Sequence, residues 1–120
     1  MSPSTPDQTA RIALDALTAA ERRAAVLYLD DALVPAGTLR LGRTEMTLAR
    51  PARIAFLDLE PGANWGHPCR YLVIDAADGS VRAIPETMPP FLRDAAPTLR
   101  VISRGSAEDW MLAAPHRPPD

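Results

Sequence analysis

Lysine is absent from this 120-residue chain, cysteine occurs once, and only 5% of the residues are aromatic. A single cysteine excludes a disulfide within the chain, so the sequence gives no sign of an oxidising compartment. The thirteen basic residues are all Arg, and fifteen acidic residues bring the formal net charge to −2. This charge gives no electrostatic reason to expect a nucleic acid or an anionic membrane as a partner.

Long hydrophobic runs are also missing. No apolar run approaches the roughly 20 residues of a membrane-spanning helix, and the first residues lack the basic and apolar regions of a secretory signal. We therefore expect a cytoplasmic protein that does not engage a membrane. Hydrophobic residues make up 47% of the chain, as in a folded protein. The length predicts a single domain, residues 1–120, with frayed ends at about 1–4 and 115–120.

Two capping-box patterns in the N-terminal third indicate helix starts. In the first, Thr5 is expected to cap a helix that has Pro6 at its first position, with Gln8 completing the box. The second box spans residues 18–21 and opens another helical pattern. The apolar residues expected on one face of this second helix are Val26, Leu29 and Leu33.

The two boxes favour two helices, with one long helix over residues 5–33 as the alternative. From Thr38 onward, apolar and polar residues alternate with the period of β-strands. Turn signals at Gly42-Arg43 and Asp78-Gly79 predict two hairpins. The strands are expected at about 39–41, 46–48, 53–59, 71–74, 81–84 and 99–102. We therefore expect an α+β fold, with an N-terminal helix or helix pair packed on an antiparallel sheet of four to six strands.

The segment of about residues 70–84, in which a strand ends in Asp75 and resumes after a short turn containing Gly79, resembles the repeated hairpin of PepSY-type domains. In that family a helix packs across an antiparallel sheet, much as in cystatins. The resemblance implies the same helix-first arrangement. It also implies a propeptide-like or inhibitor-like role, in which the domain acts by binding another protein.

The chemically densest stretch of the chain is the loop Glu60–Arg70, which holds an amide, an indole, an imidazole and a thiol within six residues. Trp65 is expected either to plug the end of the core or to anchor a partner protein. Glycines within the loop supply unusual backbone angles, which indicates a defined shape. The expected binding residues are Glu60, Asn64, Trp65, His67, Cys69 and Arg70.

His67 and Cys69 also raise the alternative of a small enzyme with thiol chemistry, because a cysteine nucleophile needs a nearby base. Pro68 between them permits the bend that such a pair requires. The more ordinary interpretation of Cys69 is a small buried residue at the start of a strand. A zinc site would need His67, Cys69 and a carboxylate such as Asp58 or Asp75, short of the four ligands of a typical structural site. We expect no metal and no cofactor.

Three carboxylates could flank one end of the central strands and act as an acid/base group. They are Asp58, Glu60 and Asp75. Ordinary salt bridges are the better interpretation, because three arginines are equally close in the sequence, namely Arg53, Arg70 and Arg82.

No catalytic motif, cofactor fingerprint or metal-ligand cluster is recognisable in the sequence. We therefore expect a non-enzymatic protein-binding or regulatory module, of an inhibitor, propeptide or accessory kind, that recognises another protein through the Glu60–Arg70 loop. The alternatives are the Cys69/His67 enzyme and an accessory subunit of a larger complex, and oligomerisation stays open.

Overall fold

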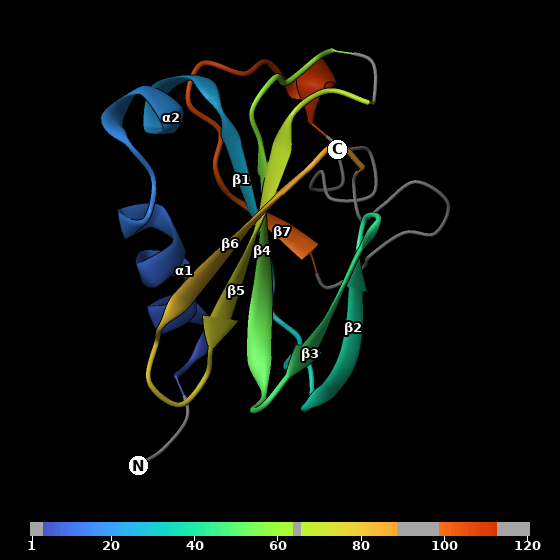
Figure 1. The fold of residues 1–120 in the computed structure, drawn as a ribbon. Coiled ribbons are helices and arrows are strands. Elements are labelled where there is room, and N and C mark those ends of the chain that lie inside the picture. The colour runs from blue at the N-terminus through green and yellow to red at the C-terminus, as the bar shows by residue number, and fades with distance from the viewer. Residues whose placement is uncertain (1–3, 64–65, 89–98, 113–120) are drawn as a thin grey trace.

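The computed structural model describes residues 4–63, 66–88 and 99–112, and Figure 1 shows their arrangement. The elements are α1 (Pro6–Asp15), α2 (Ala19–Ala24), β1 (Val26–Asp30), β2 (Gly37–Leu41), β3 (Thr44–Leu48), β4 (Ala52–Asp58), β5 (Cys69–Asp75), β6 (Val81–Glu86), β7 (Leu99–Ser103) and the 3-10 turn η1 (Asp109–Met111). In this described part of the chain, no helix has the length and apolar character needed to cross a membrane.

Five strands form one antiparallel sheet in the order β6-β5-β4-β1-β7, and β2 and β3 form a separate two-stranded sheet. In Figure 1, α1 lies on one side of the five-stranded sheet and the β2–β3 hairpin lies on the other. The predicted α+β fold, with N-terminal helices packed on an antiparallel sheet, is therefore confirmed.

Both predicted capping boxes form, and they separate the helical region into two helices. The Thr5 hydroxyl accepts a hydrogen bond from the backbone N–H of Gln8, whose side chain accepts one from the Thr5 N–H. Thr18 and Glu21 make the same reciprocal pair at the start of α2. Each box satisfies two backbone N–H groups that a helix start would otherwise leave without partners.

The second helix is shorter than the sequence predicted, and the prediction of a helical face from Val26, Leu29 and Leu33 is wrong. The helix ends at Ala24, and the next residues form β1, which pairs with both β4 and β7. Val26 and Leu29 are fully buried in the sheet, whereas Leu33 lies outside it and is exposed. A short apolar run fits a helix and a buried strand equally well, so its spacing alone could not decide.

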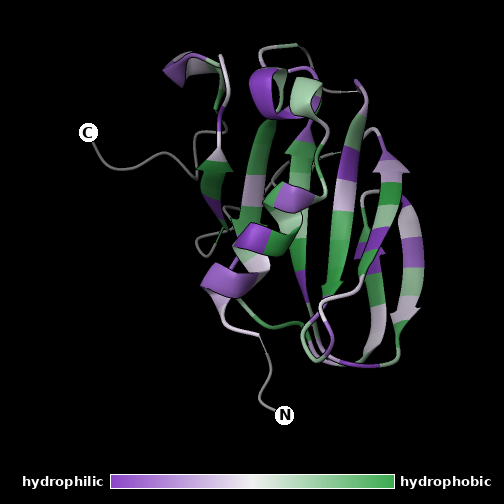
Figure 2. Ribbon diagram, turned by 90° about the vertical axis from the view of Figure 1, so that its left-hand side faces the viewer, coloured by the Kyte–Doolittle hydropathy of each residue, from purple (hydrophilic) through white to green (hydrophobic). Residues whose placement is uncertain are grey.

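Two apolar cores cover the two faces of the five-stranded sheet. The helix-side core includes Ala13 and Leu17 of the N-terminal region, packed with Leu72 and Ile74 of β5. Figure 2 shows hydrophilic residues on the outer side of α1 and hydrophobic residues along the strands behind it. The hairpin-side core is built from alternate residues of the same strands. Its largest side chains are Tyr28, Phe56 and Tyr71, together with Met46 and Leu48 of the hairpin.

The ends of three neighbouring strands lie side by side at one end of the sheet. We call this the loop end and define it by Asp58, Cys69 and Glu86. Asp58 is paired in register with Cys69, and Cys69 with Glu86. Helix α2 is tied to this end by an ion pair of 2.9 Å between Arg70 and Glu21. In Figure 1, η1 and the described residues that directly follow β4 lie together above the same end of the sheet. The loop that the sequence singled out therefore lies among several elements that are distant along the chain.

Candidate functional site

A buried hydrogen bond closes the base of the Glu60–Arg70 loop. His67 Nε2 lies 2.7 Å from Asp58 Oδ1, and the two side chains are only 5% and 4% exposed. The same carboxylate oxygen accepts a hydrogen bond of 3.0 Å from the backbone N–H of Glu60. Because Asp58 ends β4 and His67 comes just before β5, this pair holds the two stems of the loop together.

The loop also packs against η1 near the C-terminal end of the described chain. Gly62 has a φ of +88°, and a Cβ placed on it would lie 3.0 Å from Cη2 of Trp110. Only glycine can therefore hold this backbone shape with an indole so close. Trp110 is 63% exposed, and its Nε1 donates a hydrogen bond to Glu108. A large aromatic surface thus lies open to solvent beside the loop.

Cys69 is buried at the first position of β5, with 2% of its surface exposed. Burial, together with the negative charges of Glu86 and Asp58, raises the pKa of the thiol to about 12. The thiol is therefore protonated at neutral pH, whereas nucleophilic attack needs the thiolate. His67 is engaged with Asp58. The geometry suits packing of the thiol and does not suit nucleophilic chemistry.

A hollow of about 540 Å³ opens at the loop end, and we call it the loop-end hollow. Its lining is mostly apolar and combines residues from three parts of the chain that the sequence does not place together. They are Leu59, Pro68, Cys69 and Arg70 from the loop and its stems, Pro85, Glu86 and Thr87 from the end of β6, and Arg43 from the tip of the hairpin. A concave, largely apolar surface with a few charged groups at its margin is the usual form of a binding site.

Glu86 fixes the hairpin tip against the hollow. Its carboxylate accepts hydrogen bonds from the Arg43 backbone N–H at 3.2 Å and from the Thr44 hydroxyl at 2.8 Å. The backbone N–H of Thr87 makes the largest contribution to lowering the pKa of Glu86. The Arg43 side chain is exposed and forms no ion pair with any residue that the structure describes. One cationic side chain at the hollow is therefore available to a partner.

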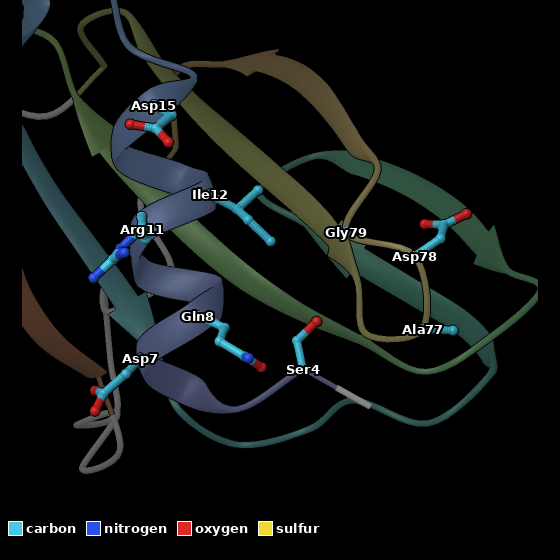
Figure 3. A pocket seen from close by; sticks show the side chains of 9 residues that line it. All are labelled: Ser4, Asp7, Gln8, Arg11, Ile12, Asp15, Ala77, Asp78 and Gly79. Atoms are coloured by element: carbon cyan, nitrogen blue, oxygen red, sulfur yellow. The ribbon is translucent and has the colours of Figure 1, made fainter. Parts of the chain in front are cut away.

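A second groove, of about 590 Å³, lies between α1 and the β5–β6 turn (Figure 3). Its three carboxylates already have arginine partners, at 3.4 Å for Asp7, 3.1 Å for Asp15 and 2.9 Å for Asp78. In Figure 3, Ile12 points toward the turn at Gly79. We therefore interpret this groove as the seam where the helix packs on the turn.

The binding residues expected from the sequence differ in how exposed the structure leaves them. Glu60 is exposed, His67 and Cys69 are buried, and Arg70 is half-buried, whereas Asn64 and Trp65 lie outside the described residues. Among the residues described, no group of three or more His, Cys, Asp and Glu side chains is placed to hold a metal ion. The sequence missed the contributions of Arg43, Pro85, Glu86 and Trp110, because strand pairing and tertiary packing bring these residues to the loop.

The possibility that three carboxylates flank one end of the central strands is excluded, because Asp58 and Asp75 do not lie at the same end. The β4–β5 register pairs Asp58 with Cys69 and Asp75 with Ala52, so Asp58 and Asp75 lie at opposite ends of the same strand pair. The arginine partners also differ from those expected. Asp75 pairs with Arg50 at 2.9 Å, and Arg53 instead donates hydrogen bonds to the backbone oxygens of Ser4 and Asp31.

Comparison of the chain with protein-family models, with curated proteins and with solved structures found no match.

Proposed function

We propose that this chain is a non-enzymatic protein-binding module whose recognition surface is the loop-end hollow together with the exposed residues of the Glu60–Arg70 loop. The observation that carries the proposal is the hollow itself. It is concave and largely apolar, and the chain builds it from the loop, the end of β6 and the tip of the hairpin. Such a surface is suited to receive apolar side chains of another protein.

The surface has a rigid frame, which favours binding. The Asp58–His67 pair fixes the loop stems, and the Glu86 carboxylate fixes the hairpin tip. A surface that is already ordered loses less conformational entropy when a partner binds than one that must first become ordered. The exposed indole of Trp110 beside Gly62 adds the kind of side chain that often anchors protein interfaces.

The environment of Cys69 supports the binding module over the thiol enzyme. An active thiol needs a depressed pKa and partial exposure, whereas Cys69 is buried and its pKa is raised to about 12. The accessory-subunit interpretation uses the same surface, since a subunit also binds through an apolar hollow. It differs in that a subunit would fold or persist only beside the larger protein.

A matched pair of substitutions in the native host tests the proposal. Pro68 lies in the hollow and Pro35 does not, although both prolines are exposed. Tagged wild-type protein, Pro68→Glu and Pro35→Glu would be purified from host lysate, with thermal melts to confirm that all three fold. We expect a protein that co-purifies with the wild type and with Pro35→Glu, recovered at least tenfold less with Pro68→Glu. Equal recovery with both variants, or no co-purifying protein, would overturn the proposal.

A further inference from the structure

Strand β6 is an edge strand of the five-stranded sheet, and its outward hydrogen-bonding groups can be assigned from the ladder. The Asp75 backbone N–H donates to Ser80 O at 2.9 Å, so residues of β6 with even numbers face β5. Val81, Ala83 and Pro85 therefore direct their backbone groups away from the sheet. Among the described residues, no hydrogen bond reaches the outward N–H groups of Val81 and Ala83.

Pro85 occupies one of the outward positions, so its missing N–H removes no bond from the β5–β6 ladder. Prolines of this kind are typical of edge strands. The outward edge thus offers two donors, from Val81 and Ala83, and three acceptors, the carbonyls of Val81, Ala83 and Pro85. An extended chain can pair with these groups by adding a further strand to the sheet.

The two sides of β6 differ in chemistry. Ile84 packs against the hairpin-side core, and because side chains alternate along a strand, Arg82 and Glu86 lie on the same side. Val81, Ala83 and Pro85 lie on the helix side and are exposed. A strand added beside β6 would therefore meet charged groups on one side and apolar groups on the other.

Two hollows lie beside this edge, one at each end of the strand. The loop-end hollow contains Pro85 and Arg43, and a smaller hollow of about 240 Å³ near the start of β6 contains Val81 and Arg82. Arg43 and Arg82 are both exposed, and neither forms an ion pair with a described residue. The edge is therefore flanked by two cationic side chains whose charge is not neutralised within the described chain.

We propose that β6 binds an extended segment of a partner protein that adds as a sixth strand to the sheet and carries acidic side chains at alternate positions, toward Arg82 and Arg43. This inference rests on the proposed function, since Pro85 and Arg43 belong to both surfaces. The paired backbone supplies the register, and the carboxylates select the partner because opposite charges on neighbouring strands attract each other.

A second copy of this chain is a poorer occupant of the same edge. Pairing of β6 with β6 of another copy would bring two Arg82 side chains onto one side of the joined sheet, where like charges repel. Glu86 could not readily compensate, since three hydrogen bonds hold its carboxylate to Arg43, Thr44 and Thr87. An acidic segment meets no such conflict.

A library of random nine-residue peptides displayed on phage provides a probe that assumes no partner. Peptides would be selected for binding to the wild-type protein, and the binding of the enriched peptides to two variants would then be measured. Ala83→Pro removes an outward N–H while leaving the β5–β6 ladder intact, and Ala83→Val keeps that N–H. We expect enriched peptides with Asp or Glu at alternate positions, bound at least tenfold more weakly by Ala83→Pro and within threefold of wild type by Ala83→Val.

A charge reversal tests the choice of partner. Arg82→Glu should weaken binding of the selected peptides at least tenfold. Arg11 is an exposed arginine on α1, and Arg11→Glu should leave binding within threefold of wild type. The inference is overturned if no peptides are enriched, if the enriched peptides lack acidic residues, or if Ala83→Pro binds them like wild type. It is also overturned if the wild type forms dimers that Ala83→Pro abolishes, because a second copy then occupies the edge.

Recovery of the host protein by Pro68→Glu and by Ala83→Pro separates this inference from the proposed function. If Pro68→Glu loses the host protein while Ala83→Pro retains it, the loop-end hollow binds a partner without strand addition, and only the inference fails. If both variants retain the host protein at wild-type levels, the proposed function fails as well.

Discussion

Asp58 Oδ1 and His67 Nε2 lie 2.7 Å apart in a nearly solvent-free position, nine residues apart along the chain. The contact joins the end of β4 to the residue that precedes Pro68 and β5. A polar contact this deeply buried fixes geometry, because leaving one partner without the other is costly. The shape of the loop-end hollow therefore depends on a pair that lies beneath its surface.

Asp58→Ala should lower the free energy of unfolding by roughly 1–3 kcal/mol, because His67 would lose this buried partner. The Glu60 backbone N–H would lose its acceptor as well. Urea unfolding at pH 7 measures the change. Asp15→Ala is the control, since that carboxylate is 70% exposed in its pair with Arg22 and should change stability by less than about 1 kcal/mol. Equal effects of the two substitutions would contradict the structural role of Asp58.

Cys69 should resist alkylation in the folded protein. Because the thiol is buried and protonated, iodoacetamide at pH 7.5 should label it only after urea unfolds the chain. Mass spectrometry of protein treated with and without urea measures the labelling. Rapid modification of the native protein would restore the thiol-enzyme alternative.

Stability should also fall at alkaline pH because of Cys69. Its pKa is raised in the fold from an ordinary 9.0 to about 12, so the unfolded chain loses this proton first. The stabilisation is full below pH 9 and is lost as the pH rises toward 12. Between pH 8 and pH 10, the free energy of unfolding of the wild type should fall by about 1.4 kcal/mol more than that of Cys69→Ala. The raised pKa keeps Tyr71 protonated in both folded proteins over this pH range, so its own contribution is the same in the two. An equal loss of unfolding free energy in the two proteins would contradict a buried, protonated thiol.

Gly42→Ala should destabilise the protein more than Gly79→Ala. Both glycines have a positive φ, +60° and +73°, so the backbone strain is similar. A Cβ at Gly42 would lie 2.5 Å from Cγ of Glu86 and would displace the carboxylate that holds the hairpin tip, whereas at Gly79 it meets only the movable end of Ile12 at 3.0 Å. Thermal melts compare the two variants, and equal melting temperatures would argue against Glu86 as a structural anchor.

Trp110→Ala should leave the free energy of unfolding within about 1 kcal/mol of wild type, since the indole is mostly exposed. If the indole belongs to the recognition surface, the same change should weaken partner binding by about 2 kcal/mol or more. Urea unfolding and recovery of the host protein measure the two effects. A large loss of stability with unchanged binding would mean that Trp110 serves the fold alone.

Local chemistry made most of the fold predictable from the sequence. The capping boxes at Thr5 and Thr18, the Gly42 turn and the alternation after Thr38 each depend on a few neighbouring residues, and each is found in the structure. The exception is Val26–Asp30. Its apolar run fits both a helix face and a strand buried on two sides, and only pairing with β4 and β7 decides between them.

The candidate site was less predictable because sheet register builds it. The sequence drew attention to Glu60–Arg70, but the residues of β6 and of the hairpin tip that complete the hollow are 15 or more residues away from that loop along the chain. Glu86 reaches the hollow through its pairing with Cys69, and Arg43 through a hydrogen bond to Glu86. Spacing along the chain carries no signal for such contacts. Trp65, which the sequence predicts to be a core plug or an anchor for a partner, lies outside the described residues.

Hydrogen exchange of the chain, alone and in complex with the protein recovered from the host, tests the central claim most directly. The account predicts slower exchange on binding in peptides covering residues 59–70 and 81–88, with little change in peptides covering α1. Protection confined to α1 and the β5–β6 turn, or no protection anywhere, would contradict a recognition surface at the loop end.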